Sequence, residues 1–179
     1  MDYSGNLFLV GPMGVGKTTI GRTLAARMNL EFFDSDQEIE AATGADIPWI
    51  FDVEGERGFR HREVKMINQL SRRKNIVLAT GGGAILDEKN RERLKKRGLV
   101  VYLRASLQQQ IERTARDRNR PLLQTGNPEQ TIKDLIVVRE PLYFEVADVV
   151  IDTNRRNPKS VSNEIIKQIK THQHSSAPE

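Results

Sequence analysis

The fold is decided by the stretch LFLVGPMGVGKT, residues 7–18. Its first four residues are apolar and predict a buried strand. The other eight match G-x-x-x-x-G-K-[ST], a loop that binds the phosphates of a nucleoside triphosphate. Gly11, Gly14 and Gly16 permit backbone conformations in which successive N–H groups point at an anion. A helix directly after this loop adds the positive end of its dipole. The stretch therefore predicts a strand, a phosphate loop and a helix in succession.

The same loop carries side chains for a donor nucleotide and its metal ion. Lys17 can reach the β- and γ-phosphates, and Thr18 offers a hydroxyl to Mg²⁺. We therefore expect a nucleoside triphosphate and Mg²⁺ to bind here. The nucleotide contacts expected from this loop are Gly14, Val15, Gly16, Lys17, Thr18 and Thr19.

Length and composition indicate one soluble α/β domain. The chain has 179 residues, of which 37% are hydrophobic and 29% charged. No apolar run approaches the roughly 20 residues that span a bilayer, and the N-terminus has no secretory signal pattern. Because there is no cysteine, disulfides, thiolate catalysis and cysteine-bound zinc are excluded. We expect a cytoplasmic protein that has no membrane partner.

The charge pattern favours small anionic ligands over nucleic acid. The formal net charge is +4, but Lys and Arg are interspersed with Asp and Glu. The chain also has no RNA-binding aromatic motif or recognition-helix pattern. Anionic small substrates explain the basic excess at least as well, so no nucleic-acid partner is predicted.

Strands and helices alternate along the chain. Strands are predicted at 7–10, 31–33, 75–80, 99–103 and 148–152. The main helices are predicted near 17–28, 57–72, 88–96, 107–116 and 128–139 and after residue 157, with Gly98 as the C-cap of the third. Such alternation predicts an α/β fold with a five-stranded parallel sheet and helices on both faces. Ligands then bind beyond the carboxyl ends of the strands.

Two aspartates follow the second strand. Asp34 and Asp36 are two residues apart, and residues at that offset on a strand point the same way. One carboxylate could serve Mg²⁺, directly or through water. The other could orient or deprotonate a substrate hydroxyl, as in kinases. The alternative is an N-cap aspartate before the next helix.

Arg60 and a triglycine stretch are candidates for binding a second substrate. Arg60 is close in sequence to Trp49, Phe51 and Phe59, and a guanidinium beside an apolar wall suits a carboxylate. Its alternative is an arginine on a solvated helix face. Gly81–Gly83 follow a strand directly and would let a ligand approach backbone N–H groups. The alternative here is a flexible turn.

Further arginines crowd one irregular segment. Arg113, Arg116, Arg118 and Arg120 could belong to a lid that closes on phosphates, where an arginine stabilises the charge of the transferred group. A solvated charged loop is the alternative. Arg139, expected at the end of a helix, is either a second carboxylate ligand or a partner of the helix dipole.

Together these segments resemble the shikimate kinase family from about residue 6 to residue 169. GPMGVGKT resembles its phosphate loop, a motif shared by many kinases. Five other motifs resemble that family as a set: FFDSD (32–36), FDVEGERGFR (51–60), ATGGGA (79–84), RPLL (120–123) and REPLYFEVAD (139–148).

The resemblance implies a P-loop kinase architecture of the nucleoside monophosphate kinase type. Residues 1–170 would form one domain, with a substrate-binding insertion at about 34–62 and a lid at about 114–126. Residues 171–179 would be a disordered tail. The implied activity is transfer of the ATP γ-phosphate to the 3-hydroxyl of shikimate, on the chorismate route to aromatic amino acids. A monomer is expected.

The resemblance also implies roles for individual residues. Thr18 would hold Mg²⁺ directly and Asp34 through water, while Lys17, Asp36 and Arg120 would be catalytic. The expected contacts to shikimate are Asp36, Arg60, Gly81, Gly82, Gly83 and Arg139. The expected contacts to ATP beyond the phosphate loop are Arg113, Arg120, Arg156, Asn157 and Pro158.

The residue inventory suits shikimate, which has one carboxylate and three hydroxyls. Two arginines, an aspartate and a row of N–H groups match those functions, whereas a nucleotide acceptor would need a base pocket. Three alternatives stay open. They are another small-molecule kinase on this fold, acting on gluconate or a nucleoside monophosphate, a non-catalytic nucleotide-binding protein, and a nucleic-acid binder.

Overall fold

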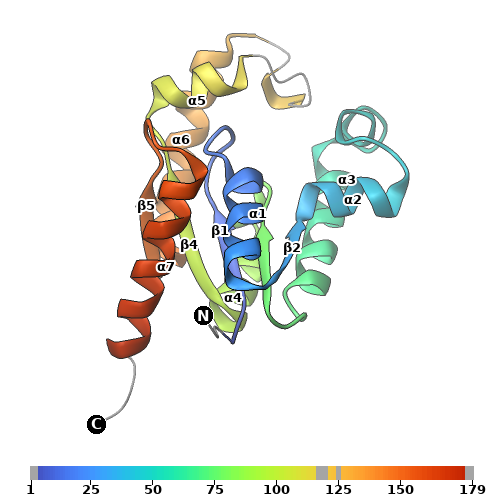
Figure 1. Ribbon diagram of the computed structural model, residues 1–179. Coiled ribbons are helices and arrows are strands. Elements are labelled where there is room, and N and C mark those ends of the chain that lie inside the picture. The colour runs from blue at the N-terminus through green and yellow to red at the C-terminus, as the bar shows by residue number, and fades with distance from the viewer. Residues whose placement is uncertain (1–3, 116–120, 124–125, 176–179) are drawn as a thin grey trace.

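A five-stranded parallel sheet forms the centre of the computed structural model, which describes residues 4–115, 121–123 and 126–175 (Figure 1). The strands are β1 (Leu7–Val10), β2 (Glu31–Asp34), β3 (Ile76–Ala79), β4 (Leu99–Arg104) and β5 (Val149–Asp152). They lie in the order β2-β3-β1-β4-β5, and every pairing is parallel. The fold class predicted from the sequence is confirmed.

Helices cover both faces of this sheet. They are α1 (Lys17–Met28), α2 (Ser35–Thr43), α3 (Ile47–Leu70), α4 (Glu88–Arg97), α5 (Leu107–Thr114), α6 (Pro128–Val146) and α7 (Pro158–Ser175), with short 3-10 turns η1 (Ala84–Leu86) and η2 (Pro121–Leu123). α1 and α7 pack on one face, and α3, α4 and α6 on the other. All four residues of β1 are fully buried, as expected for a strand covered on both sides.

The strand order sets the position of the site. β1 lies between β3 and β4, so the later strands are added to the sheet on both sides of β1. Ligands of open parallel sheets bind at such a switch point, beyond the carboxyl ends of the strands. In Figure 1 the loop after β1 lies between α2 and α3 on one side and α5 on the other.

Helix α3 begins ten residues earlier than predicted. It starts at Ile47, with the Asp46 side chain accepting a hydrogen bond from the Trp49 N–H at 2.9 Å. The backbone leaves helical geometry at Gly55 (φ 70°, ψ 176°), which divides α3 into two segments. The sequence prediction found only the second segment, because Pro48 and Gly55 suggest breaks. Proline is tolerated in the first turn of a helix, where its missing N–H costs no bond.

Helix α6 does not end at Arg139 as predicted. It continues through Pro141 to Val146. Pro141 lacks the N–H that would bond to the carbonyl of Val137. Burial of Tyr143 and Val146 against the sheet offsets that loss. Tertiary packing thus overrides the local signal for a helix end.

Of two further predictions, one is confirmed and one needs correction. Gly98 is the C-cap of α4 as predicted, but its backbone is extended (φ −175°) and not left-handed. A side chain there would place its Cβ 2.7 Å from the Asn6 carbonyl oxygen, so glycine permits a close approach of two chain segments. The last helix runs to Ser175, so residues 171–175 continue it and do not begin a disordered tail.

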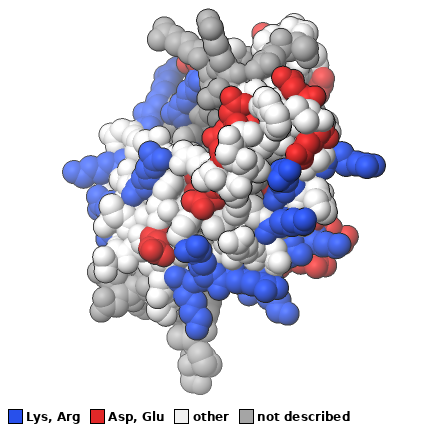
Figure 2. Space-filling model, turned by 90° about the vertical axis from the view of Figure 1, so that its right-hand side faces the viewer, with Lys and Arg blue, Asp and Glu red and all other residues white. Residues whose placement is uncertain are grey.

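Both basic and acidic side chains lie on the face of the molecule shown in Figure 2. Within the described parts of the chain, no helix combines the length and the apolar character needed to cross a membrane.

Candidate active site

The phosphate loop ends at the open N-terminus of α1. Gly14 (φ 78°) and Gly16 (φ 91°) adopt left-handed backbone angles, and no side chain caps the first turn of α1. The N–H groups of that turn can therefore serve an anion. Lys17 Nζ donates hydrogen bonds to the carbonyl oxygens of Gly11 (2.7 Å) and Pro12 (2.8 Å), which hold it against the loop.

Asp34 joins the phosphate loop to α2. Its Oδ2 accepts a hydrogen bond from the Thr18 hydroxyl at 2.6 Å. Its Oδ1 accepts from the N–H groups of Asp36 (3.0 Å) and Gln37 (3.3 Å). Asp34 is therefore the N-cap of α2 and the partner of Thr18 at once, so the two sequence interpretations of this residue are compatible.

The pair Thr18 and Asp34 has the chemistry that Mg²⁺ requires. Both offer oxygen atoms, and both line the pocket that contains the phosphate loop. Among the residues that the structure describes, no group of three or more His, Cys, Asp or Glu could hold a metal ion. Mg²⁺ needs no such group, because it keeps several waters and takes further oxygens from substrate phosphates. The residues present fit this ion.

Asp36 lies beyond the end of the second strand. β2 ends at Asp34, and Asp36 belongs to the first turn of α2. We expected both carboxylates to face the same way because of their spacing along a strand, and that reason is wrong. Both nevertheless line the pocket of the phosphate loop, because α2 begins where β2 ends. Asp36 Oδ1 lies against Gly81, where a Cβ would be only 2.8 Å away.

A second pocket adjoins the first. Its walls come from α3, the triglycine stretch, α6 and η2, and they include Arg60, Glu63, Gly83 and Arg139. Asp36, Ile47, Gly81 and Gly82 line both pockets. The two spaces therefore meet at Asp36 and the triglycine stretch.

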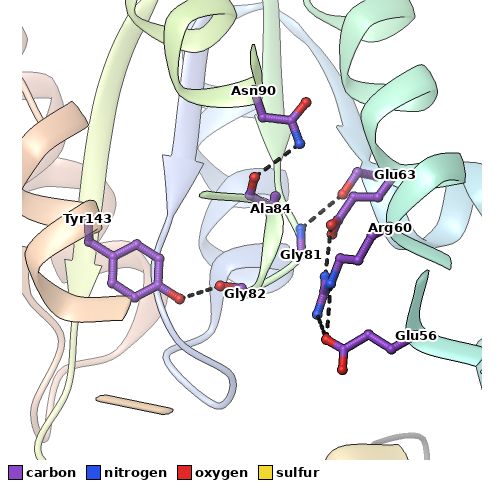
Figure 3. Close-up of polar contacts among 9 residues, drawn as sticks. Glu56, Arg60, Glu63, Gly81, Gly82, Ala84, Asn90 and Tyr143 are labelled. Carbon is purple, nitrogen blue, oxygen red and sulfur yellow. Dashed lines mark hydrogen bonds and ion pairs between the residues drawn. The ribbon is translucent and has the colours of Figure 1, made fainter. Parts of the chain in front are cut away.

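The triglycine stretch is tied down on several sides (Figure 3). The Gly81 N–H donates to Ser35 Oγ at 2.9 Å, and the Tyr143 hydroxyl donates to the Gly82 carbonyl at 2.5 Å. Within the described residues, the N–H groups of Gly82 and Gly83 have no hydrogen-bond acceptor. Hydrogen bonds thus anchor the stretch on two sides, which argues against the flexible-turn alternative.

Arg60 extends between two glutamates in the second pocket (Figure 3). Its guanidinium lies 5.2 Å from the centre of the Phe59 ring, which in turn contacts the Phe51 ring. The predicted apolar wall therefore exists. Trp49 does not belong to it, because its side chain is 54% exposed and outside the pocket. Gly83 packs directly on Arg60, where any Cβ would collide with the guanidinium.

Arg139 is the second arginine of this pocket. It is only 4% exposed and lies inside α6, so the alternative of a solvated partner for the helix dipole is wrong. Its Nε has no hydrogen-bond partner within the described part of the chain. Burial lowers the pKa of Arg139, and the nearby charge of Arg60 lowers it further. The negative charge of an anion in the pocket would raise this pKa again.

Glu63 is a site residue that sequence reasoning missed. It is 1% exposed and accepts a hydrogen bond from Arg60 Nη1 at 2.8 Å. Burial raises the pKa of Glu63, against the lowering effect of the Arg60 charge. Its position three residues after Arg60, on the buried face of a helix, was the available signal.

The residues expected around adenine lie only partly at the phosphate-loop pocket. Arg113 lines the pocket of the phosphate loop, and its Nη1 donates to the Gly14 carbonyl at 3.0 Å. The side chain of Arg156 bonds to Ser160, and Asn157 caps α7 through the Ser160 N–H at 2.8 Å. None of Arg156, Asn157 and Pro158 lines that pocket.

Three of the arginines expected in a lid lie outside the described residues, namely Arg116, Arg118 and Arg120. The neighbouring Pro121 and Leu122, in η2, do line the second pocket. These two residues of the segment expected to be a lid thus contribute apolar contacts to the second pocket.

A parallel sheet of this order, with G-x-x-x-x-G-K-T after its central strand and an acidic residue between two pockets, defines a P-loop kinase. Comparison with known proteins gives the family. The shikimate kinase family profile matches residues 13–170, and the chain belongs to that family. Shikimate kinase of Chromohalobacter salexigens is 61% identical over 164 residues, which are 92% of this chain and 91% of that protein.

Solved structures agree with this assignment. Shikimate kinase from Acinetobacter baumannii in complex with shikimate matches with a TM-score of 0.92 and 55% identity, over 94% of each chain. A gluconokinase from Sinorhizobium meliloti has a TM-score of 0.62 at 15% identity, over 99% of this chain and 100% of the other. That second likeness concerns the fold alone.

Proposed function

We propose that this protein transfers the γ-phosphate of ATP to the 3-hydroxyl of shikimate, giving shikimate 3-phosphate and ADP. The observation that carries this proposal is the meeting of two pockets at Asp36, Gly81 and Gly82. One pocket contains the phosphate loop. The other contains two arginines suited to a carboxylate and free N–H groups suited to hydroxyls. Membership of the shikimate kinase family supports the same reaction.

On the acceptor side, Arg60 and Arg139 would bind the shikimate carboxylate. Gly81–Gly83 would contact its hydroxyls, chiefly through the N–H groups of Gly82 and Gly83. Asp36 would orient or deprotonate the attacking hydroxyl, since it lies at the junction of the pockets. No nucleophilic side chain is required, because phosphoryl transfer depends on positioning and charge stabilisation.

On the donor side, the phosphate loop and Lys17 would hold the ATP phosphates. Thr18 would bind Mg²⁺ directly and Asp34 through water, and the ion when bound neutralises charge on the β- and γ-phosphates. Arg120 would close on the transferred group. The remaining nucleotide contacts proposed are Gly14, Val15, Gly16, Thr19, Arg113, Arg156, Asn157 and Pro158.

A coupled ADP-release assay with shikimate, gluconate and AMP as acceptors tests the proposal. We expect release that depends on shikimate and little with the other two. Equal rates on all three acceptors would reject the specificity. ATP binding without shikimate-dependent ADP release would favour a non-catalytic protein. The cytoplasmic location and the monomeric state stay predictions from the sequence.

A further inference from the structure

The guanidinium of Arg60 is engaged on all three of its nitrogens by glutamates of its own helix. Nη1 donates to Glu63 Oε2 at 2.8 Å. Nη2 and Nε both donate to Glu56 Oε1, at 3.1 Å and 3.3 Å. Glu56 therefore lies on the Nε–Nη2 edge, one of the paired N–H edges by which arginine binds a carboxylate. An acceptor carboxylate that approaches this edge of Arg60 therefore finds it hydrogen-bonded to Glu56.

The two glutamates differ in their freedom to leave Arg60. Glu63 is 1% exposed and lies in the regular second segment of α3. Glu56 is 48% exposed and directly follows Gly55, where the helix geometry is interrupted. Water can take over the hydrogen bonds of an exposed carboxylate at little cost, whereas an uncompensated buried charge is strongly destabilising. Glu56 is thus the partner that can be exchanged.

We propose that Glu56 is a displaceable counter-anion which the carboxylate of the acceptor replaces on Arg60. Glu56 keeps this edge of Arg60 paired between turnovers, and it weakens acceptor binding because its charge and its hydrogen bonds compete with those of the substrate. This inference rests on the proposed function, in which Arg60 binds the shikimate carboxylate. It makes Glu56 a residue that sets acceptor affinity, with no part in the transfer step itself.

The chain provides a matched control two residues away. Glu54 is also an exposed glutamate of α3, and it pairs with Arg62 through two hydrogen bonds of 2.6 Å and 2.8 Å. It makes no hydrogen bond or ion pair with Arg60. Glu54→Gln therefore removes the same charge from the same stretch of chain without freeing Arg60.

The experiment compares wild type, Glu56→Gln and Glu54→Gln in the full chain. Calorimetric Kd and steady-state KM are measured for shikimate and for its uncharged methyl ester. We expect Glu56→Gln to bind shikimate about two- to fivefold more tightly, the range of an exposed ion pair. Its affinity for the ester should not change. Glu54→Gln should match wild type with both ligands.

Three outcomes would overturn the role of Glu56. Weaker or unchanged binding of shikimate by Glu56→Gln would show that Glu56 supports Arg60 or does nothing. An equal gain for the ester would show that the effect does not involve the acceptor carboxylate. An equal gain in Glu54→Gln would show a general charge effect. If the wild type turns over shikimate in the same assay, any of these results rejects the inference alone. If it does not, the proposed function fails as well.

Discussion

Asp36 lies where the two pockets meet, next to Gly81, whereas Lys17 donates its hydrogen bonds to carbonyls of the phosphate loop. Its charge should therefore act on the acceptor hydroxyl. We expect Asp36→Asn to lower kcat by about 10²- to 10⁴-fold, the usual contribution of a general base, with little change in ATP affinity. Steady-state kinetics and an ATP-binding titration check this. A variant that weakened ATP binding alone would show that Asp36 is misassigned.

Arg139 should act on the acceptor through its charge. We expect Arg139→Ala to raise KM for shikimate by about 10- to 100-fold, the loss of a charged hydrogen bond, and KM for ATP much less. Arg139→Lys keeps the charge and most of the buried volume, so it should fall between alanine and wild type. A larger effect on ATP than on shikimate would reject the carboxylate role.

Glu63 should make stability depend on pH. Burial raises its folded pKa above the ordinary value of 4.5, so the native state holds this proton more tightly than the unfolded chain. The resulting stabilisation is complete below the ordinary pKa and is lost as pH rises through the folded pKa. The free energy of unfolding of wild type relative to Glu63→Gln should therefore be higher at pH 4 than at pH 7. Urea unfolding of both proteins at both pH values measures this difference. A difference in the free energy of unfolding that stays constant or grows in favour of wild type with rising pH would contradict the prediction.

At the scale of elements, the sequence predicted what local rules determine. The strand 7–10, the loop after it and the helix Lys17–Met28 follow from apolar runs and glycine spacing, and the structure has them at those bounds. Local rules failed where packing decided. Helix α6 continues past Pro141 because Tyr143 is buried, and Gly98 serves a contact with Asn6 that only the folded chain creates.

The break in α3 yields a prediction at the same scale. Gly55 (φ 70°, ψ 176°) lies in a backbone region that is essentially restricted to glycine, and Gly44 (φ 69°, ψ 14°) lies in the milder left-handed region. A Cβ would meet no atom within 4 Å at either position. An alanine at the two positions therefore differs only in the backbone strain that it causes. We expect Gly55→Ala to lower the free energy of unfolding by about 1–3 kcal/mol, and Gly44→Ala by less. Denaturant unfolding of both variants checks the order, and the reverse order would show that Gly55 is unstrained.

At the scale of the whole molecule, the place of the site was predictable and its assembly was not. Parallel strands put the phosphate loop, Asp34 and the triglycine stretch at one edge, whatever their order. The second pocket instead joins α3 to α6, and the pattern of residues alone does not bring Arg139 to Arg60. Only the family resemblance assigned both arginines to one substrate. Glu63 was missed because its importance depends on its burial beside Arg60.

The two pockets meet at shared residues, but their basic side chains are separate, so each pocket should bind its own ligand. This can be measured on the intact protein. A ligand that binds only the native state stabilises it by about 2.7 kcal/mol at 100 times its Kd. For a domain of this size that raises Tm by about 5–10 °C. We expect ATP with Mg²⁺ and shikimate each to give such a shift to the wild type.

Lys17→Met separates the two effects, because Lys17 lines the phosphate-loop pocket and not the second one. This variant should lose most turnover and most of the ATP shift, since the phosphate charge is no longer compensated. It should keep the full shikimate shift. Arg139→Lys is the reciprocal control and should reduce the shikimate shift while keeping the ATP shift. If Lys17→Met lost both shifts, the pockets would form one cooperative unit, and the division of labour between donor and acceptor residues would have to be abandoned.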